Sequence, residues 1–221
     1  LGAWGEARRP RSRSDLACDC AGATYTCAAM VKADRRFWIR SFVLLCLLAL
    51  FAQLTAAIPY LSVTYDEPIY TAIGYADLTA GDFYWHGVIG HGPLTNMLAA
   101  WPLLLHPRPV DVTQLPHWGG DSSLGFGRDV LAALGPLKAT LFATRVSITW
   151  LTVLLAAFVF RWARAGWGSA VGCAALALFA FEPNLIAHGQ LNTTDMGVTA
   201  FGFVGTYWLS RTLRRPRPLP Y

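Results

Sequence analysis

Long apolar runs constrain this chain more than any other feature of its sequence. They begin near Phe42, Ala139, Gly168 and Met196 and end near Tyr60, Phe160, Ala187 and Leu209. Crossing a bilayer takes about 20 predominantly apolar residues, a length that the last run reaches only with its flanks. Because 54% of the residues are apolar or aromatic and only 14% are charged, the sequence predicts an integral membrane protein.

The basic residues indicate how these runs cross the membrane. They gather before the first run, after the second and after the last (Lys32, Arg35, Arg36, Arg40; Arg161, Arg164; Arg211, Arg214, Arg215, Arg217). Cytoplasmic loops carry such an excess of Lys and Arg. A shorter apolar stretch, 93–105, predicts a helix on the membrane surface. If this stretch were a fifth span, Arg161 and Arg164 would lie on the outer side of the membrane, against the distribution of the other basic residues. We therefore expect an all-α membrane protein with about four transmembrane helices (42–60, 139–160, 168–187, 196–209) and one long outer loop, 61–138, carrying interfacial helices.

The two ends differ from the membrane region, 37–211. Residues 1–36 are largely polar and basic, so we expect a disordered cytoplasmic leader in which Met30 is a conventional start. The cysteines of this leader (Cys18, Cys20, Cys27) lack a paired Cys-x-x-Cys spacing, which favours disorder over a metal cluster. Residues 212–221 are basic and proline-rich and predict a cytoplasmic stub of a longer chain.

Ionisable side chains near membrane depth are costly and usually mark functional sites. Asp66 and Glu67 follow the first apolar run, and Arg145 lies inside the second. His188 and Asp195 lie between the third and fourth runs, so four spans place the whole set on the outer side. Structural alternatives exist, since an acid can cap a helix and an arginine can extend to the lipid headgroups.

These residue types suit transfer of a sugar from a lipid-linked phosphate donor. A carboxylate at the membrane rim can take a proton from an acceptor hydroxyl as general base, and arginine can stabilise a departing phosphate. The chain has no Walker lysine loop and no Gly-x-Gly-x-x-Gly motif, and nothing in it indicates a nucleic-acid partner. It also lacks a Gly-x-Ser-x-Gly elbow and a His-Glu-x-x-His pair.

The order of several motifs resembles the protein O-mannosyltransferase-like, GT-C class glycosyltransferases. Asp66-Glu-Pro, Leu78-Thr-Ala-Gly-Asp82 and His91-Gly-Pro-Leu94 are similar to the family's first outer loop. Arg145-Val-Ser147 and the segment 182–195 are similar to its later motifs, and the resemblance covers about residues 37–211. Protein-mannosylating members usually have an arginine where this chain has Gln190, so the acceptor is left open among protein, lipid and glycan.

The resemblance implies an inverting transfer from a polyprenyl-phosphate-linked sugar, mannose or similar, to an acceptor hydroxyl. It implies a multi-pass protein of the bacterial inner membrane whose active site faces outward. Asp66 is then the expected general base and Glu67 its catalytic partner. The expected substrate-binding residues are Arg145, His91, His188 and Asp195. Metal dependence stays open, because adjacent acids can hold a divalent cation or act without one.

The sequence leaves two alternatives to a glycosyltransferase open. One is a transporter or flippase for a lipid-linked or anionic solute, in which Arg145 and Asp195 line a path. A transporter is expected to carry acids or broken helices near the middle of the bilayer. The other is an inactive fragment or non-catalytic subunit of the same family.

Overall fold

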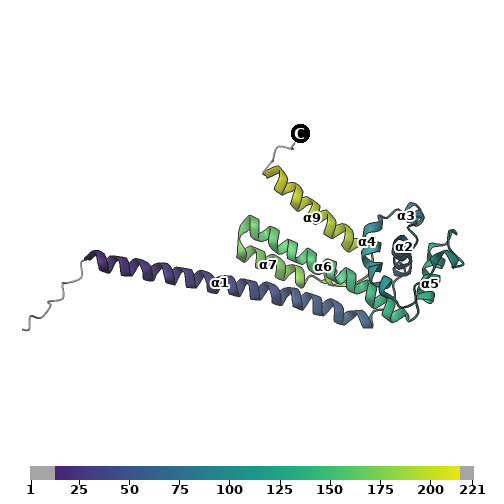
Figure 1. The fold of residues 1–221 in the computed structure, drawn as a ribbon, viewed down its shortest axis with the longest axis horizontal. Helices are drawn as coiled ribbons and strands as arrows, with labels where there is room; N and C mark the ends of the chain where they lie inside the picture. The colour runs from purple at the N-terminus through teal and green to yellow at the C-terminus, as the bar shows by residue number, and fades with distance from the viewer. Residues whose placement is uncertain (1–12, 215–221) are drawn as a thin grey trace, which may run out of the picture. The chain divides into compact units, whose positions relative to one another are not determined.

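The computed structural model describes the backbone of residues 13–214 and the side chains of residues 35–213. Every regular element in this part of the chain is helical, which confirms the predicted all-α class (Figure 1). The chain divides into two units, residues 1–42 and 43–221. The second unit contains all of the candidate site residues.

In the described part of the chain, two helical stretches are long and apolar enough to cross a membrane. One is the stretch Arg35–Tyr60, in which helix α1 (Arg13–Ala57) is followed by the 3-10 turn η1 (Ile58–Tyr60). The other is α6 (Leu137–Trp167). The predicted first two spans, 42–60 and 139–160, lie inside these helices. The two helices support association with a membrane.

Helix α1 begins within the predicted disordered leader, 1–36, so the backbone of 13–36 is helical where the sequence predicts disorder. The side chains of the three leader cysteines (Cys18, Cys20, Cys27) lie outside the described residues.

The predicted third span, 168–187, is not one continuous helix. Helix α7 (Ser169–Ala180) has 12 residues, and a break separates it from α8 (Pro183–His188). Such a helix is about 18 Å long, shorter than the hydrocarbon core of about 30 Å. The break has a local cause, because Pro183 lacks an amide hydrogen and Glu182 adopts an extended conformation that caps α8. The last helix, α9 (Asp195–Arg214), extends beyond the predicted end at Leu209.

Residues 61–138, predicted as one outer loop, form a small helical bundle. Its elements are α2 (Glu67–Thr79), α3 (Tyr84–Ile89), α4 (Pro93–Ala100), η2 (Trp101–Leu105), η3 (Val112–Gln114) and α5 (Ser123–Leu134). Helix α2 lies between α4 and α5 (Figure 1). The sequence predicts interfacial helices in this loop, but Tyr70, Ile73 and Gly74 are enclosed, because α2 is buried from Glu67 to Asp77.

The predicted surface helix, 93–105, consists of α4 and η2. One of its faces is buried in the bundle, with Asn96 and Ala100 fully inaccessible to solvent. The opposite face exposes Leu94, Leu98 and Trp101, which follow one another at helical spacing. An exposed apolar stripe of this kind is typical of a helix that lies in a membrane interface.

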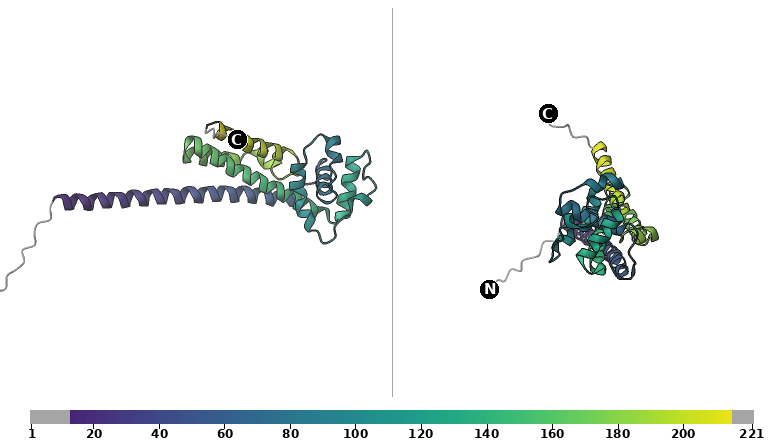
Figure 2. Two further views of the ribbon diagram at one scale, coloured as in Figure 1. Left: turned by 45° about the horizontal axis from the view of Figure 1, so that its top comes forward. Right: turned by 90° about the vertical axis from the view of Figure 1, so that its right-hand side faces the viewer.

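Helix α6 connects this bundle to the other long helices. It packs against α7 and α9 (Figures 1 and 2). Leu50 and Leu54 of α1 are completely buried in one cluster with Ala156 of α6 and Leu176 of α7. In contrast, Phe142, Trp150 and Leu154 of α6 are exposed, as expected of side chains that contact lipid tails.

We predict that Gly74→Ala lowers the free energy of unfolding by about 1–3 kcal/mol, the usual cost of overpacking. A Cβ at this position would collide with the backbone carbonyl of Asn96 in α4, so the two helices would have to separate. Gly87→Ala is the matched control, because a Cβ there meets open space in helix α3. Thermal unfolding of the detergent-solubilised protein tests this, and equal melting temperatures for the two variants would contradict the close approach of α2 and α4.

Candidate functional site

The centre of the site is a buried ion pair between the first turn of α2 and the N-terminal third of α6. The Arg145 guanidinium donates from Nε to Glu67 Oε1 and from Nη2 to Glu67 Oε2, both at 2.7 Å. The two side chains are 1% and 0% exposed. This two-bond geometry is the strongest form of a carboxylate–arginine contact.

Arg145 also binds the chain segment that leaves the first membrane-length helix. Its Nη1 donates to the carbonyl oxygens of Ile58 and Leu61, at 3.3 and 3.1 Å. Its Nη2 donates to the carbonyl oxygen of Ser62 at 2.7 Å. This geometry favours a structural role for Arg145 over the substrate-binding role that the resemblance implies, because the guanidinium is buried and its donors are engaged.

The Glu67 carboxylate accepts two further hydrogen bonds, from the backbone amides of Thr64 at 2.9 Å and Asn192 at 3.2 Å. Burial raises the pKa of Glu67, but the hydrogen bonds and charge of Arg145 and the two amides outweigh burial and hold this pKa below its ordinary value. Glu67 is thus an ionised structural group. The arrangement leaves Asp66, whose side chain is exposed, as the acid of the pair that can reach a substrate.

Asn192 brings the segment before α9 against α2. In addition to its amide contact with Glu67, its side chain donates from Nδ2 to Thr71 Oγ1 at 2.9 Å, and Asn192 is completely buried. The Thr152 hydroxyl of α6 donates to the Gly189 carbonyl oxygen at 2.9 Å. These contacts fix the segment that leads to Asp195, although Asn192 lies 125 residues after Glu67 in the sequence.

A second group of residues, the Tyr70 cluster (Asp66, Tyr70, His91, Thr194 and Asp195), lies around the Tyr70 hydroxyl. The hydroxyl lies 3.3 Å from His91 Nε2. Burial raises the pKa of Tyr70, and the nearby carboxylates of Asp66 and Asp195 raise it further, while Thr194 acts in the opposite direction. The structure therefore brings together three residues that the sequence predicts for the site: Asp66, His91 and Asp195.

His188 lies at the edge of this cluster. Its Nδ1 is 3.8 Å from Asp195 Oδ2, and both side chains are more than half exposed. The Asp195 carboxylate also accepts a hydrogen bond from the Thr193 hydroxyl at 3.0 Å. An exposed pair at this distance contributes little to stability, so both side chains can bind a solute.

His91 is held in place by a histidine of α3. The backbone carbonyl of His91 lies 2.8 Å from Nδ1 of His86, whose Nε2 lies 2.8 Å from Asp77 Oδ2. Asp77 is buried, and burial raises its pKa, although the contact with His86 partly opposes this. His86 thus has a structural role, as a link between α2 and the loop that carries His91.

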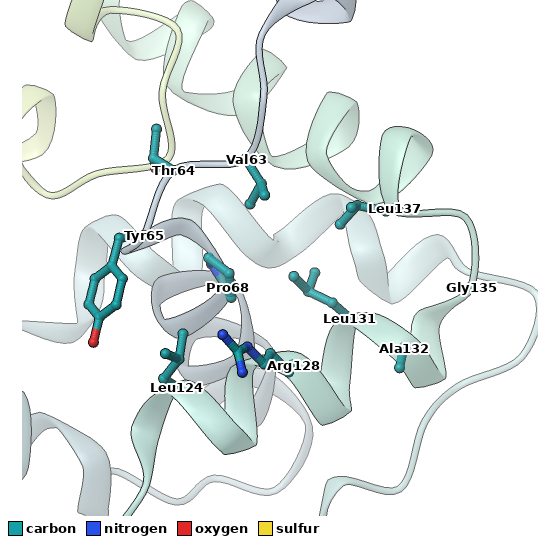
Figure 3. A pocket seen from close by; sticks show the side chains of 10 residues that line it. All are labelled: Val63, Thr64, Tyr65, Pro68, Leu124, Arg128, Leu131, Ala132, Gly135 and Leu137. Carbon is teal, nitrogen blue, oxygen red and sulfur yellow. The ribbon is translucent and has the colours of Figure 1, made fainter.

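An apolar pocket with a cavity volume of about 430 Å³ opens beside the N-terminal end of α2 (Figure 3). Tyr65 and Pro68, which flank Asp66 and Glu67 in the sequence, form part of its wall. Arg128 of α5 also lines it, and its guanidinium is drawn among the apolar side chains of the wall (Figure 3). Arg128 is exposed, and among the described residues no carboxylate forms an ion pair with it.

Neither Tyr70 nor Arg128 is among the site residues that the sequence predicts. A local signal for Tyr70 was present, because residues i and i+4 of a helix lie on the same face. Tyr70 follows Asp66 at this spacing, and its amide donates to the Asp66 carbonyl oxygen at 3.0 Å. Arg128 had no comparable signal, since α5 reaches the pocket only through tertiary packing.

Among the residues whose side chains are described, no group of three or more His, Cys, Asp or Glu residues is arranged to hold a metal ion. Comparisons of the chain with models of protein families, with curated proteins and with solved structures found no significant match.

We predict that Arg145→Gln lowers the free energy of unfolding by about 3–5 kcal/mol, because it leaves the buried Glu67 carboxylate without its cation. The double variant Glu67→Gln/Arg145→Met should recover much of this loss, since it removes both charges. Arg108→Gln, at an exposed position, serves as the control. Melting temperatures of the purified variants measure the effect, and wild-type stability of Arg145→Gln would refute the importance of the pair.

Proposed function

We propose that this chain forms the membrane region of a GT-C-like glycosyltransferase that uses a polyprenyl-phosphate-linked sugar. The observation that carries the proposal is the position of Asp66. Its side chain is exposed, and the next residue, Glu67, is held by the buried ion pair with Arg145. A catalytic base must be held precisely while remaining open to substrate. Asp66 meets both conditions, because its backbone is at the N-cap of α2 and its side chain makes no capping hydrogen bond.

In the proposed reaction an acceptor hydroxyl attacks the anomeric carbon of the sugar. The bond from that carbon to the phosphate oxygen breaks, and the polyprenyl phosphate leaves with the bonding electrons. Asp66 takes the proton of the hydroxyl as general base. In this proposal His91 and Asp195, beside Tyr70, bind hydroxyl groups of the sugar or the acceptor.

The apolar pocket beside α2 supports a donor of this class. Its walls match an isoprenoid chain, and the Arg128 guanidinium can bind the phosphate by paired hydrogen bonds. In this proposal Arg128 takes the phosphate-binding role that the sequence suggested for Arg145. Charge stabilisation of the departing phosphate is the expected contribution of such a cation.

We also propose four crossings of a bacterial inner membrane, made by α1 from Arg35 onward, by α6, by α7 together with α8, and by α9. The proposal gains support from Arg161, Arg164 and Arg211, which line one pocket at the C-terminal ends of α6 and α9. Their shared location agrees with a single basic, cytoplasmic side. The Tyr70 cluster would then face outward.

We predict that Asp66→Asn reduces sugar transfer by about 100-fold or more, the usual contribution of a general base. The assay uses the protein reconstituted in liposomes with a labelled polyprenyl-phosphate mannose donor. The melting temperature should stay unchanged, because the Asp66 side chain is exposed. Asp121→Asn, at another exposed acid of the same region, is the matched control and should retain transfer.

Retained transfer by Asp66→Asn would remove Asp66 from the catalytic role. Movement of the lipid-linked sugar across the membrane by the wild-type protein, without any transfer, would favour the transporter or flippase alternative instead.

We predict that a cysteine at Gln114 is labelled by a membrane-impermeant maleimide in intact cells, whereas one at Gly166 is labelled only after permeabilisation. Both positions are exposed, so accessibility depends on the side of the membrane. The native cysteines are replaced by alanine in this background. Labelling of Gly166→Cys from outside would overturn the proposed orientation.

A further inference from the structure

A large pocket near the C-terminal ends of α6 and α9 is lined by three arginines. This arginine pocket has a cavity volume of about 730 Å³ and lies between α6 and α9. Arg161 and Arg164 of α6 and Arg211 of α9 line it together with Tyr207. Nothing in the proposed transfer reaction uses these residues.

The Tyr207 hydroxyl holds two of the cations together. It accepts hydrogen bonds from Arg161 Nε at 3.2 Å and from Arg211 Nη1 at 3.4 Å, and Tyr207 is 4% exposed. Each guanidinium has five N–H donors, so most donors of both arginines are left for a ligand. The guanidinium of Arg211 also stacks over Trp208, 5.9 Å from the ring centroid.

The residues whose side chains are described do not neutralise the three positive charges. Within the described part of the chain no carboxylate forms an ion pair with Arg161, Arg164 or Arg211, and no acid lines the pocket. Like charges held close together repel one another, and an anion bound between them removes that cost. The pocket therefore has the charge of an anion-binding site.

The location of the pocket identifies the kind of anion. Arg161 and Arg164 lie near the C-terminal end of α6, a helix long and apolar enough to cross a membrane. Leu154 and Phe158 extend the wall of the pocket into the apolar part of this helix. A ligand that fits has a phosphate at the membrane surface and an apolar chain that follows the helix inward. Basic pockets between membrane helices on the cytoplasmic side bind anionic lipid headgroups.

We propose that the arginine pocket binds the phosphate headgroup of an anionic membrane phospholipid, with an acyl chain of that lipid along Leu154 and Phe158. The lipid joins the ends of α6 and α9 through charge-assisted hydrogen bonds. This site is separate from the Tyr70 cluster and from the pocket of Arg128. It stands independently of the proposed transferase activity.

The test titrates the purified full chain in dodecyl maltoside with dioleoyl phosphatidylglycerol and counts bound lipid by native mass spectrometry. The wild type should retain this lipid at least about fivefold better than dioleoyl phosphatidylcholine, whose headgroup has no net charge. The variant Arg161→Gln/Arg211→Gln should lose about tenfold or more in affinity for phosphatidylglycerol. Tyr207→Phe keeps both charges but removes their shared acceptor, and should weaken binding less than the double variant.

The matched control is Arg108→Gln/Lys138→Gln, which removes the same number of exposed charges outside the pocket. It should bind phosphatidylglycerol within about twofold of the wild type. Melting temperatures without added lipid show whether each variant is folded, and the single variant Arg164→Gln replaces the double variant if the latter fails to fold.

Three outcomes would overturn the proposal. Equal losses in the control and in the arginine variants would show a non-specific effect of charge. Wild-type affinity in the folded arginine variants would exclude the pocket. Displacement of the lipid by millimolar inorganic phosphate would identify a site for free phosphate in place of a lipid.

Discussion

The buried pair of Glu67 and Arg145 is the contact on which the rest of the bundle depends. It joins α2 to α6, and the remaining donors and acceptors of the pair bind the exit of the first membrane-length helix and the segment before α9. Four parts of the chain are thus tied to one ion pair. Removing two charges from water is costly, so such a pair is favourable only when hydrogen bonds satisfy its other atoms. This condition is met by backbone groups of Thr64, Ser62 and Asn192.

The sequence predicted the helical class and the two membrane-length helices, because length and hydropathy are properties of a local stretch. It was wrong about a continuous helix over 168–187, although a local signal existed: the residue before a proline is biased toward extended conformations, and Glu182 precedes Pro183. It also predicted interfacial helices within 61–138, whereas α2 is enclosed in a bundle. Burial of that helix depends on α4 and α5, which pack on both of its sides, and no pattern within α2 itself contains this information.

The candidate site was predicted in part. The acids at 66 and 67 were recognised as a pair, but their different roles follow from burial, since one is exposed and the other is enclosed with Arg145. Asp66, His91 and Asp195 were expected on one side of a membrane, and the structure gathers them around the Tyr70 hydroxyl. The position of Arg128 beside this region could not be anticipated, because only the packing of α5 against α2 brings it there.

The sequence separation of the ion pair has a consequence for biosynthesis. Glu67 leaves the ribosome 78 residues before Arg145, an interval of several seconds at about 5–20 residues per second. During that time the carboxylate has no cation to accompany it into a buried position, so α2 must stay hydrated. The first membrane helix can insert early, but the bundle that follows it closes only when α6 arrives. Assembly of this part of the protein is therefore ordered by translation: the carboxylate comes first, the arginine of the second long helix follows, and the amide of Asn192 arrives last.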